Sequence, residues 1–173
     1  MAENSIWKAG IPMQPVPMSQ AQASLSYIVL PKDTNPGSGV HGSTLHGGRY
    51  LTLLDETSYC AAMKFCRRHI VTVRFDGALT RVVPVGHVVR SQAQVIYAGH
   101  TSMLVRVVAQ AEDMRKGEVY ECARCYFTCT AVDDQTLRPV PVPPLVAETE
   151  EQRQWLEEGK ARMEAYKRQR EQG

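Results

Sequence analysis

Two glycines and an aspartate in the first third of the sequence are residue types that could do acyl chemistry. Gly47 and Gly48 stand at the expected start of a helix, and Asp55 follows about two helical turns later. Glycines at a helix N-terminus leave backbone N–H groups free to bind developing negative charge, and a nearby carboxylate can act as a general base. The pattern fits hydrolysis of an acyl compound. A glycine-rich entry loop beside a paired structural aspartate explains it equally well.

Periodicity along the chain indicates the elements that would position these residues. Leu51, Leu54 and Phe65 lie on one stripe of a helix from about 48 to 68. Its other face is also largely apolar, so we expect the helix to be covered on most sides and Asp55 to be buried. Alternating or β-rich stretches predict strands at 23–30, 70–75, 87–98, 101–112 and 118–132. Because the last three have short connections, the layout is α+β, with the long helix lying on an antiparallel sheet.

The chain is expected to form one domain, residues 23–146, with an extension at each end. Residues 1–22 contain prolines and no sustained period, which predicts an extended arm. The proline-rich segment 138–145 leads to a terminal helix within 147–173, which begins with a possible capping box from Thr149 to Gln152. Its apolar stripe is thin and Gly159 would weaken it, so we expect a solvated helix that docks lightly on the body or on a partner.

Composition and charge exclude several classes of function. A net charge of +2 and a pI near 8.3 are too mild for nucleic-acid binding by bulk charge. No apolar run approaches the roughly 20 residues of a membrane span, and the first residues lack the features of a secretory signal. The five cysteines are an odd number and require no disulfide framework. We therefore expect a cytoplasmic protein that binds neither nucleic acid nor membrane.

Cys122 and Cys125 form a C-x-x-C pair, which raises the question of a metal site. The strand pattern of residues 118–132 would point Cys122 to one face and Cys125 and Cys129 to the other. Diverging ligands cannot close a tetrahedral zinc site. We expect thiols that pack in the core, and no metal.

Five segments in order resemble the hotdog-fold acyl-CoA thioesterases, in the acyl-CoA hydrolase group of the 4-hydroxybenzoyl-CoA thioesterase-like superfamily. They are DTN (33–35), HGGRYLTLLDETSYCAA (46–62), IVTV (70–73), GHTSM (99–103) and TAVDDQTLRPVPVPPL (130–145). The resemblance implies a hotdog fold, in which an antiparallel sheet wraps a long central helix. It also implies an acyl-CoA substrate, no cofactor, and a homodimer with active sites at the interface, assembled further into a tetramer or hexamer.

The resemblance also assigns roles to individual residues. Asp55 would act as a general base or as a nucleophile. Asn35, facing Asp55 of the other subunit, would orient water or the thioester, and Thr72 would assist the water. The N–H of Gly47 or Gly48 would receive the thioester oxygen as it becomes negative.

Further residues follow from the same resemblance. Ser102, His100 and Arg68 are expected contacts of coenzyme A, with His100 in place of the arginine usual in the family. His46 would line the pocket or only satisfy the loop. Two other functions stay open: a hydratase or dehydratase that moves protons with His46 or His41 and the helical aspartate, and a hotdog protein that binds acyl-CoA without catalysis.

The glycine-rich motif occurs twice, as GVHG ending at Gly42 and as TLHGG ending at Gly48. Counted back from Asp55, the family's Gly-Gly falls on the second copy. Counted forward from Asn35, the family's spacing fits the first copy. We therefore expect an enlarged loop, in which His41 and Gly42 reposition Asn35 or shape the mouth of the pocket.

Overall fold

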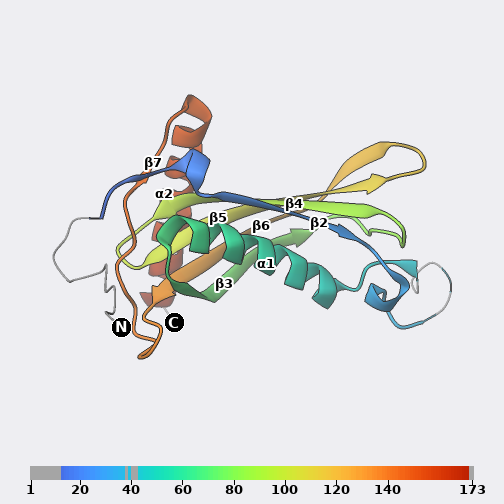
Figure 1. The fold of residues 1–173 in the computed structure, drawn as a ribbon, viewed down its shortest axis with the longest axis horizontal. Coiled ribbons are helices and arrows are strands. Elements are labelled where there is room, and N and C mark those ends of the chain that lie inside the picture. The colour runs from blue at the N-terminus through green and yellow to red at the C-terminus, as the bar shows by residue number, and fades with distance from the viewer. Residues whose placement is uncertain (1–12, 38, 40–42, 172–173) are drawn as a thin grey trace, which may run out of the picture.

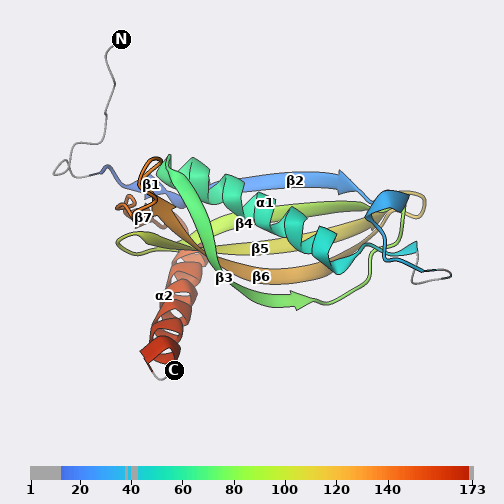
Figure 2. The same cartoon turned by 90° about the horizontal axis from the view of Figure 1, so that it is seen from below.

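The computed structural model describes residues 13–37, 39 and 43–171, which form a five-stranded antiparallel sheet with a long helix against each face (Figures 1 and 2). The strands are β1 (Val16–Pro17), β2 (Gln22–Ile28), β3 (His69–Leu79), β4 (Val88–Ala98), β5 (Ser102–Asp113), β6 (Glu118–Val132) and β7 (Leu145–Val146). The helices are α1 (Gly47–Cys66) and α2 (Glu150–Glu171), with short 3-10 turns η1 (Met18–Gln20) and η2 (Pro31–Asp33). The large sheet has the order β2-β4-β5-β6-β3, so β2 and β3 are its edges. The predicted α+β class is confirmed.

Helix α1 covers one face of the sheet, which we call the inner face. Leu54 and Phe65 are almost completely buried there among inward-pointing aliphatic residues of β4, β5 and β6. The helix ends at Cys66, and the C-cap residue Arg67 adopts a left-handed φ of 55° while its N–H donates to the carbonyl of Met63 at 2.8 Å. This C-cap stops the helix two residues before the end that periodicity predicted.

Strand β3 is longer than the predicted 70–75 because it pairs with β6 along nearly its whole length. At Gly77 the two strands come so close that a Cβ atom would lie 2.3 Å from the Cβ of Cys125. Glycine is therefore required at this position for the edge strand to stay paired.

The direction of Cys122 differs from the prediction. Strand β6 has a bulge opposite β5 at this residue, which has no partner in the ladder. The bulge turns Cys122 to the inner face, where Cys125 and Cys129 also lie. The hydroxyl of Tyr50 donates to the Cys122 sulfur at 2.6 Å. Alternation placed Cys122 on the opposite face because it assumes a strand without bulges.

The part of the N-terminal arm that the structure describes, from residue 13, packs against the proline-rich segment. Strand β1 pairs in parallel with β7, and the Val16 N–H donates to the Pro144 carbonyl at 2.9 Å. Met18 is fully buried, and its carbonyl accepts a hydrogen bond from the Gln94 side chain at 2.9 Å. The predicted arm therefore has a docking surface of its own.

Helix α2 lies on the opposite, outer face, towards one end of the sheet (Figures 1 and 2). The predicted capping box is confirmed, because the N–H of Gln152 donates to the Thr149 hydroxyl and the N–H of Thr149 donates to the Gln152 side chain, both at 3.2 Å. A second apolar cluster joins this helix to the sheet. Its buried members are Ile96, Leu104, Tyr126, Met163 and Tyr166.

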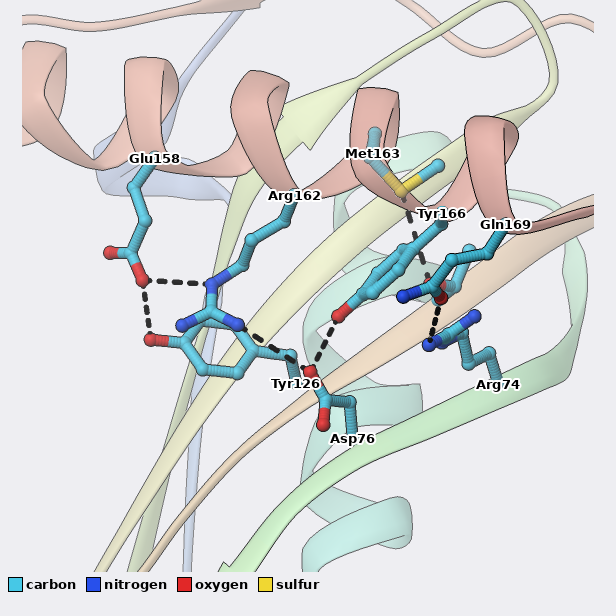
Figure 3. A network of polar contacts seen from close by, with 9 residues as sticks. Arg74, Asp76, Tyr126, Glu158, Arg162, Met163, Tyr166 and Gln169 are labelled. Atoms are coloured by element: carbon cyan, nitrogen blue, oxygen red, sulfur yellow. Dashed lines mark hydrogen bonds and ion pairs between the residues drawn. The ribbon is translucent and has the colours of Figure 1, made fainter.

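A polar network also fastens α2 to the sheet (Figure 3). The hydroxyl of Tyr126 and the guanidinium of Arg162 both donate to Glu158, at 2.6 and 3.0 Å. The hydroxyl of Tyr166 donates to Asp76 of β3 at 2.8 Å. Cluster and network together show that α2 docks on the body of the domain through one face, while most of its residues are exposed.

Gly159 of α2 lies directly against β4 with no room for a side chain, so a substitution there should weaken the docking. A Cβ at this position would lie 2.8 Å from the Cβ of Tyr97 and 3.1 Å from the Ile96 carbonyl oxygen. We expect Gly159→Leu to destabilise the fold by about 1 to 3 kcal/mol, as overpacking does. Urea unfolding measures this against Ala161→Leu, an exposed position on the same helix. Equal stability of the two variants would contradict the packing argument.

Candidate active site

A hydrogen bond between Thr72 and Asp55 joins the edge strand to the central helix. The Thr72 hydroxyl donates to Oδ1 of Asp55 at 2.8 Å. Asp55 is half-buried, not buried as periodicity predicted. Within the described part of the chain, its second oxygen, Oδ2, has no hydrogen-bond partner. One carboxylate oxygen is thus fixed, and the other is available to take a proton.

Thr72 reaches Asp55 because β3 contains a bulge. Thr72 pairs with Cys129 of β6, the next paired residue is Arg74, and Val73 between them is the extra residue. In a regular strand, residues two apart share a face. Here the bulge turns Thr72 towards α1, while Arg74 lies on the outer face against α2.

Two further side chains lie behind this pair. The hydroxyl of Ser58 and the sulfur of Cys129 are 3.7 Å apart, and both residues are fully buried. Burial raises the pKa of the Cys129 thiol to about 11, so the thiol is neutral. Sequence reasoning gave neither residue a part in the site, although the three-residue spacing from Asp55 to Ser58 places both on one side of the helix.

The start of α1 has one backbone donor in use and one available. His46 is the N-cap, and its Nδ1 accepts the N–H of Gly48 at 3.1 Å. The N–H of Gly47 has no partner among the described residues. Gly47 also borders a shallow cavity of about 180 Å³, whose other walls include Tyr50 and Leu79. An available N–H at the positive end of a helix dipole, beside a cavity, is suited to binding an anionic oxygen.

Asn35 lies at this same end of α1 and holds the preceding loop together. Its side-chain amide donates to the hydroxyl and the carbonyl of Thr44, at 3.1 and 3.2 Å. No contact joins Asn35 to Asp55 of the same chain in the described residues. The structure therefore brings Thr72 to Asp55, and Asn35 to the helix start, as two separate groups. The predictions for His41 and Gly42 lie outside the described residues.

Asp33 forms a buried ionic cluster that sequence reasoning missed. Its side chain is only 6% exposed, accepts the Leu30 N–H at 3.1 Å and lies 3.5 Å from the Arg49 guanidinium. The nearby Tyr27 hydroxyl is the main cause that holds the pKa of Asp33 below its usual value, with help from the Leu30 N–H and the nearby cations. The cluster joins the end of β2 and the first turn of α1, and so fixes the loop that carries Asn35.

The three expected coenzyme A contacts do not converge on Asp55 in the single chain. Ser102 lies beside Thr130, with the two hydroxyl oxygens 3.4 Å apart. The carbonyl of His100 accepts the N–H of Val142, while its side chain is exposed. Arg68 lies near Asp133, whose pKa is lowered mainly by hydrogen bonds from Thr136 and to a small extent by the charge of Arg68.

Within residues 13–37, 39 and 43–171, no cluster of three or more His, Cys, Asp or Glu side chains could hold a metal ion. No helix there combines the length and the apolar character needed to cross a membrane.

Comparison with known proteins identifies the family. A family model described as thioesterase superfamily matches residues 42–118. An uncharacterized acyl-CoA thioester hydrolase of Bacillus subtilis is 34% identical over 126 residues, which cover 72% of this chain and 69% of that protein. The chain belongs to the thioesterase superfamily.

Solved structures place this thioesterase in the acyl-CoA hydrolase group and confirm the predicted hotdog fold. An apo hexameric acyl-CoA thioesterase is 30% identical, with a TM-score of 0.83 over 91% of this chain and 97% of that one. An acyl-CoA hydrolase from Staphylococcus aureus was solved with butyryl coenzyme A, coenzyme A and coenzyme A disulfide. It is 27% identical, with a TM-score of 0.80 over 91% of this chain and 93% of that one.

The Staphylococcus aureus thioesterase has also been solved as three variants, with alanine replacing one asparagine, one aspartate or one threonine. Its aspartate and threonine are 17 positions apart, which is the separation of Asp55 and Thr72. Its asparagine precedes the aspartate by fewer positions than Asn35 precedes Asp55. The difference agrees with an enlarged loop in this chain.

The lowered pKa of Asp33 makes the acid stability of the thioesterase fold testable. Because the carboxyl has a lower pKa when folded than the roughly 3.9 of an unfolded chain, its charged form stabilises the fold at neutral pH. This stabilisation is lost as pH falls below about 4. We expect Asp33→Asn to be less stable than wild type at pH 7, with the difference narrowing as the pH approaches 3.

Urea unfolding at several pH values checks the Asp33 prediction. Asp134→Asn, at an exposed carboxylate, is the matched control and should follow the wild-type curve. A difference between Asp33→Asn and wild type that stayed constant with pH would show that the ionised carboxylate is not what stabilises this end of the site.

Proposed function

We propose that this thioesterase hydrolyses an acyl-CoA thioester to a free carboxylic acid and coenzyme A, with Asp55 as general base. The observation that carries the proposal is the Thr72 hydrogen bond, which fixes Oδ1 of Asp55 and leaves Oδ2 for water. Water loses a proton to Asp55 while its oxygen attacks the thioester carbonyl carbon. The C–S bond then breaks, and the sulfur of coenzyme A leaves and takes up the proton.

The start of α1 in a second copy of the chain would stabilise the oxygen of the tetrahedral intermediate. The N–H of Gly47 is the available donor, because the N–H of Gly48 already bonds to His46. A backbone donor at a helix N-terminus is pre-oriented and so needs no reorganisation as charge develops on the oxygen. A base, a water molecule and this backbone donor are sufficient for the hydrolysis, so the proposal includes no metal or cofactor.

The contacts of His46 favour hydrolysis over the hydratase alternative. A hydratase histidine must gain and lose protons during turnover. Nδ1 of His46 accepts the Gly48 N–H in the N-cap, and protonation of Nδ1 would break that bond. We therefore assign His46 to forming the helix start, and catalysis to Asp55.

We further propose that the complete site forms between two copies of the chain. β3 is an edge strand, and it exposes apolar side chains that include Val71 and Phe75. α1 also exposes Leu51 and Met63. These residues would pair β3 with a second copy and bring its Asn35 towards Asp55. The hexameric relative supports assembly beyond a dimer. We place the protein in the cytoplasm, as its cysteine content indicates.

Substitution of the Asp55–Thr72 pair tests the proposed base. We expect Asp55→Asn to lower kcat for thiol release by about 10² to 10⁴, the usual contribution of a general base. We expect Thr72→Val to lower it by about 10 to 100, because a hydrogen bond to a charged group is lost. Both effects are measured by trapping free thiol released from acetyl, butyryl, aromatic and palmitoyl thioesters of coenzyme A.

Thr72→Ser is the matched control, because serine keeps the hydroxyl, and it should retain most of the activity. No thiol release by wild type from any of the four substrates would refute the hydrolase proposal and favour an acyl-CoA-binding protein. Full activity of Asp55→Asn would refute the role of Asp55 alone.

A charge on the edge strand tests the shared site. Val71 is 47% exposed on β3, and lysine on an edge strand opposes pairing with a second strand. We expect Val71→Lys to lower the molecular mass measured by light scattering towards the 19.3 kDa of a single chain. The variant should lose its thiol-release activity to the same extent. Val146→Lys, also at an exposed valine, is the control. A monomeric Val71→Lys protein with full activity would show that one chain completes the site.

A further inference from the structure

Ser58 and Cys129 form a buried polar contact that joins α1 to the sheet behind the Asp55–Thr72 hydrogen bond. Both residues are completely buried, and the Ser58 oxygen lies 3.7 Å from the Cys129 sulfur. Thr72 is the residue opposite Cys129 in the β3–β6 ladder, so its side chain and the thiol stand on the same face of the sheet. Four polar side chains thus succeed one another from the core to the candidate base.

The Ser58 hydroxyl does not take the partner that hydroxyls inside a helix often take. A serine or threonine there can donate to the carbonyl four residues earlier, as the neighbouring Thr57 does to Leu53 at 2.7 Å. Ser58 forms no such bond, and within the described part of the chain Cys129 is the only hydrogen-bond partner of its hydroxyl. The hydroxyl is therefore directed out of the helix, towards the thiol.

The number of protons fixes the direction of each hydrogen bond. The single hydroxyl proton of Thr72 is used on Oδ1 of Asp55, and an ionised carboxylate can only accept. A hydrogen bond between Thr72 and the Cys129 sulfur therefore requires the thiol as donor. The thiol carries its proton, because burial raises its pKa to about 11 despite the opposing effect of the nearby Ser58 and Thr72 hydroxyls. With that proton directed at Thr72, Ser58 must be the donor in its contact with the sulfur.

We propose that Ser58 and Cys129 are positioning residues, which hold the Thr72 hydroxyl in the orientation that donates to the candidate base. The Ser58 hydroxyl donates to the Cys129 sulfur, the thiol donates to the Thr72 oxygen, and the Thr72 hydroxyl donates to the carboxylate. We call this chain of donors the thiol relay. Hydrogen bonds that run in one direction polarise one another, so the relay strengthens the last of them. Its effect on turnover rests on the proposed function, whereas the hydrogen bonds themselves do not.

The thiol relay restricts a hydroxyl that would otherwise rotate. A threonine O–H turns about its C–O bond to suit whichever acceptor is near. When the Thr72 oxygen accepts the thiol proton, its own proton is left for Asp55. Ser58 and Cys129 are completely buried and so do not touch the substrate. Loss of the relay should therefore lower kcat and leave KM unchanged.

Single substitutions test the thiol relay through kcat. We expect Ser58→Ala and Cys129→Ala each to lower kcat by about 3- to 10-fold, the usual effect of one lost hydrogen bond, with the thioester that the wild type hydrolyses fastest. Cys129→Ser keeps a donor of similar size and should have nearly the wild-type kcat. Thr57→Val is the matched control, because it removes a buried hydroxyl whose hydrogen bond stays within α1, and it should leave kcat unchanged.

The Thr72→Val background separates the thiol relay from simple packing. Without the Thr72 hydroxyl the relay has no end point, so Ser58→Ala and Cys129→Ala should cause no further loss of kcat. A packing defect would lower kcat by the same factor in both backgrounds, and that result would overturn the proposal. The proposal would also be overturned if folded Cys129→Ser lost as much activity as Cys129→Ala.

The S–H stretching vibration of Cys129 tests the thiol relay without substrate. Infrared difference spectra between wild type and Cys129→Ser identify this band among those of the five cysteines. We expect the band to move to higher frequency in Thr72→Val, because the S–H bond strengthens when it loses its acceptor. An unchanged band would overturn the relay even in an active enzyme. A shifted band in a protein that hydrolyses no thioester would overturn only the proposed function.

Discussion

The single extra residue in β3 determines which side chains of this strand face α1 and which face α2. Because Val73 is bulged out of the ladder, Thr72 faces α1 and Arg74 faces α2, although residues two apart in a regular strand would share one face. The Thr72 hydroxyl that holds Asp55 and the Arg74 guanidinium that lies against Tyr166 of α2 thus come from residues only two positions apart, yet they lie on opposite sides of the sheet. Removing the bulge would abolish one of these two arrangements.

The elements with strong periodicity were predictable from sequence, and the bulges were not. The helix with Asp55, the strand at 118–132 and the capping box from Thr149 to Gln152 all occur as predicted. Alternation assigns faces correctly only while the ladder is unbroken, so it misplaced Cys122. Family resemblance assigned both Thr72 and Asp55 to the site, but it did not predict their hydrogen bond, and no local pattern specifies a contact between residues 17 positions apart across two elements.

The particular contacts that dock α2 could not be predicted, because the residues that make them look polar in the sequence. Tyr126 and Tyr166 combine an apolar ring with a hydroxyl, and each hydroxyl finds a carboxylate across the interface. The sequence predicted that Gly159 would weaken the helix, yet this glycine is what allows close contact with β4. A propensity penalty of about 1 kcal/mol is small beside the packing that it permits.

The buried sulfur atoms have a consequence for a protein whose proposed product is a free thiol. Cys66, Cys122, Cys125 and Cys129 are all buried, and desolvation raises the pKa of each thiol. Exchange with a disulfide requires an accessible thiolate, which these residues do not offer. The released coenzyme A, when oxidised to its disulfide, therefore has no route to form mixed disulfides with these four core sulfurs, and the interior is protected from the chemistry of its own product.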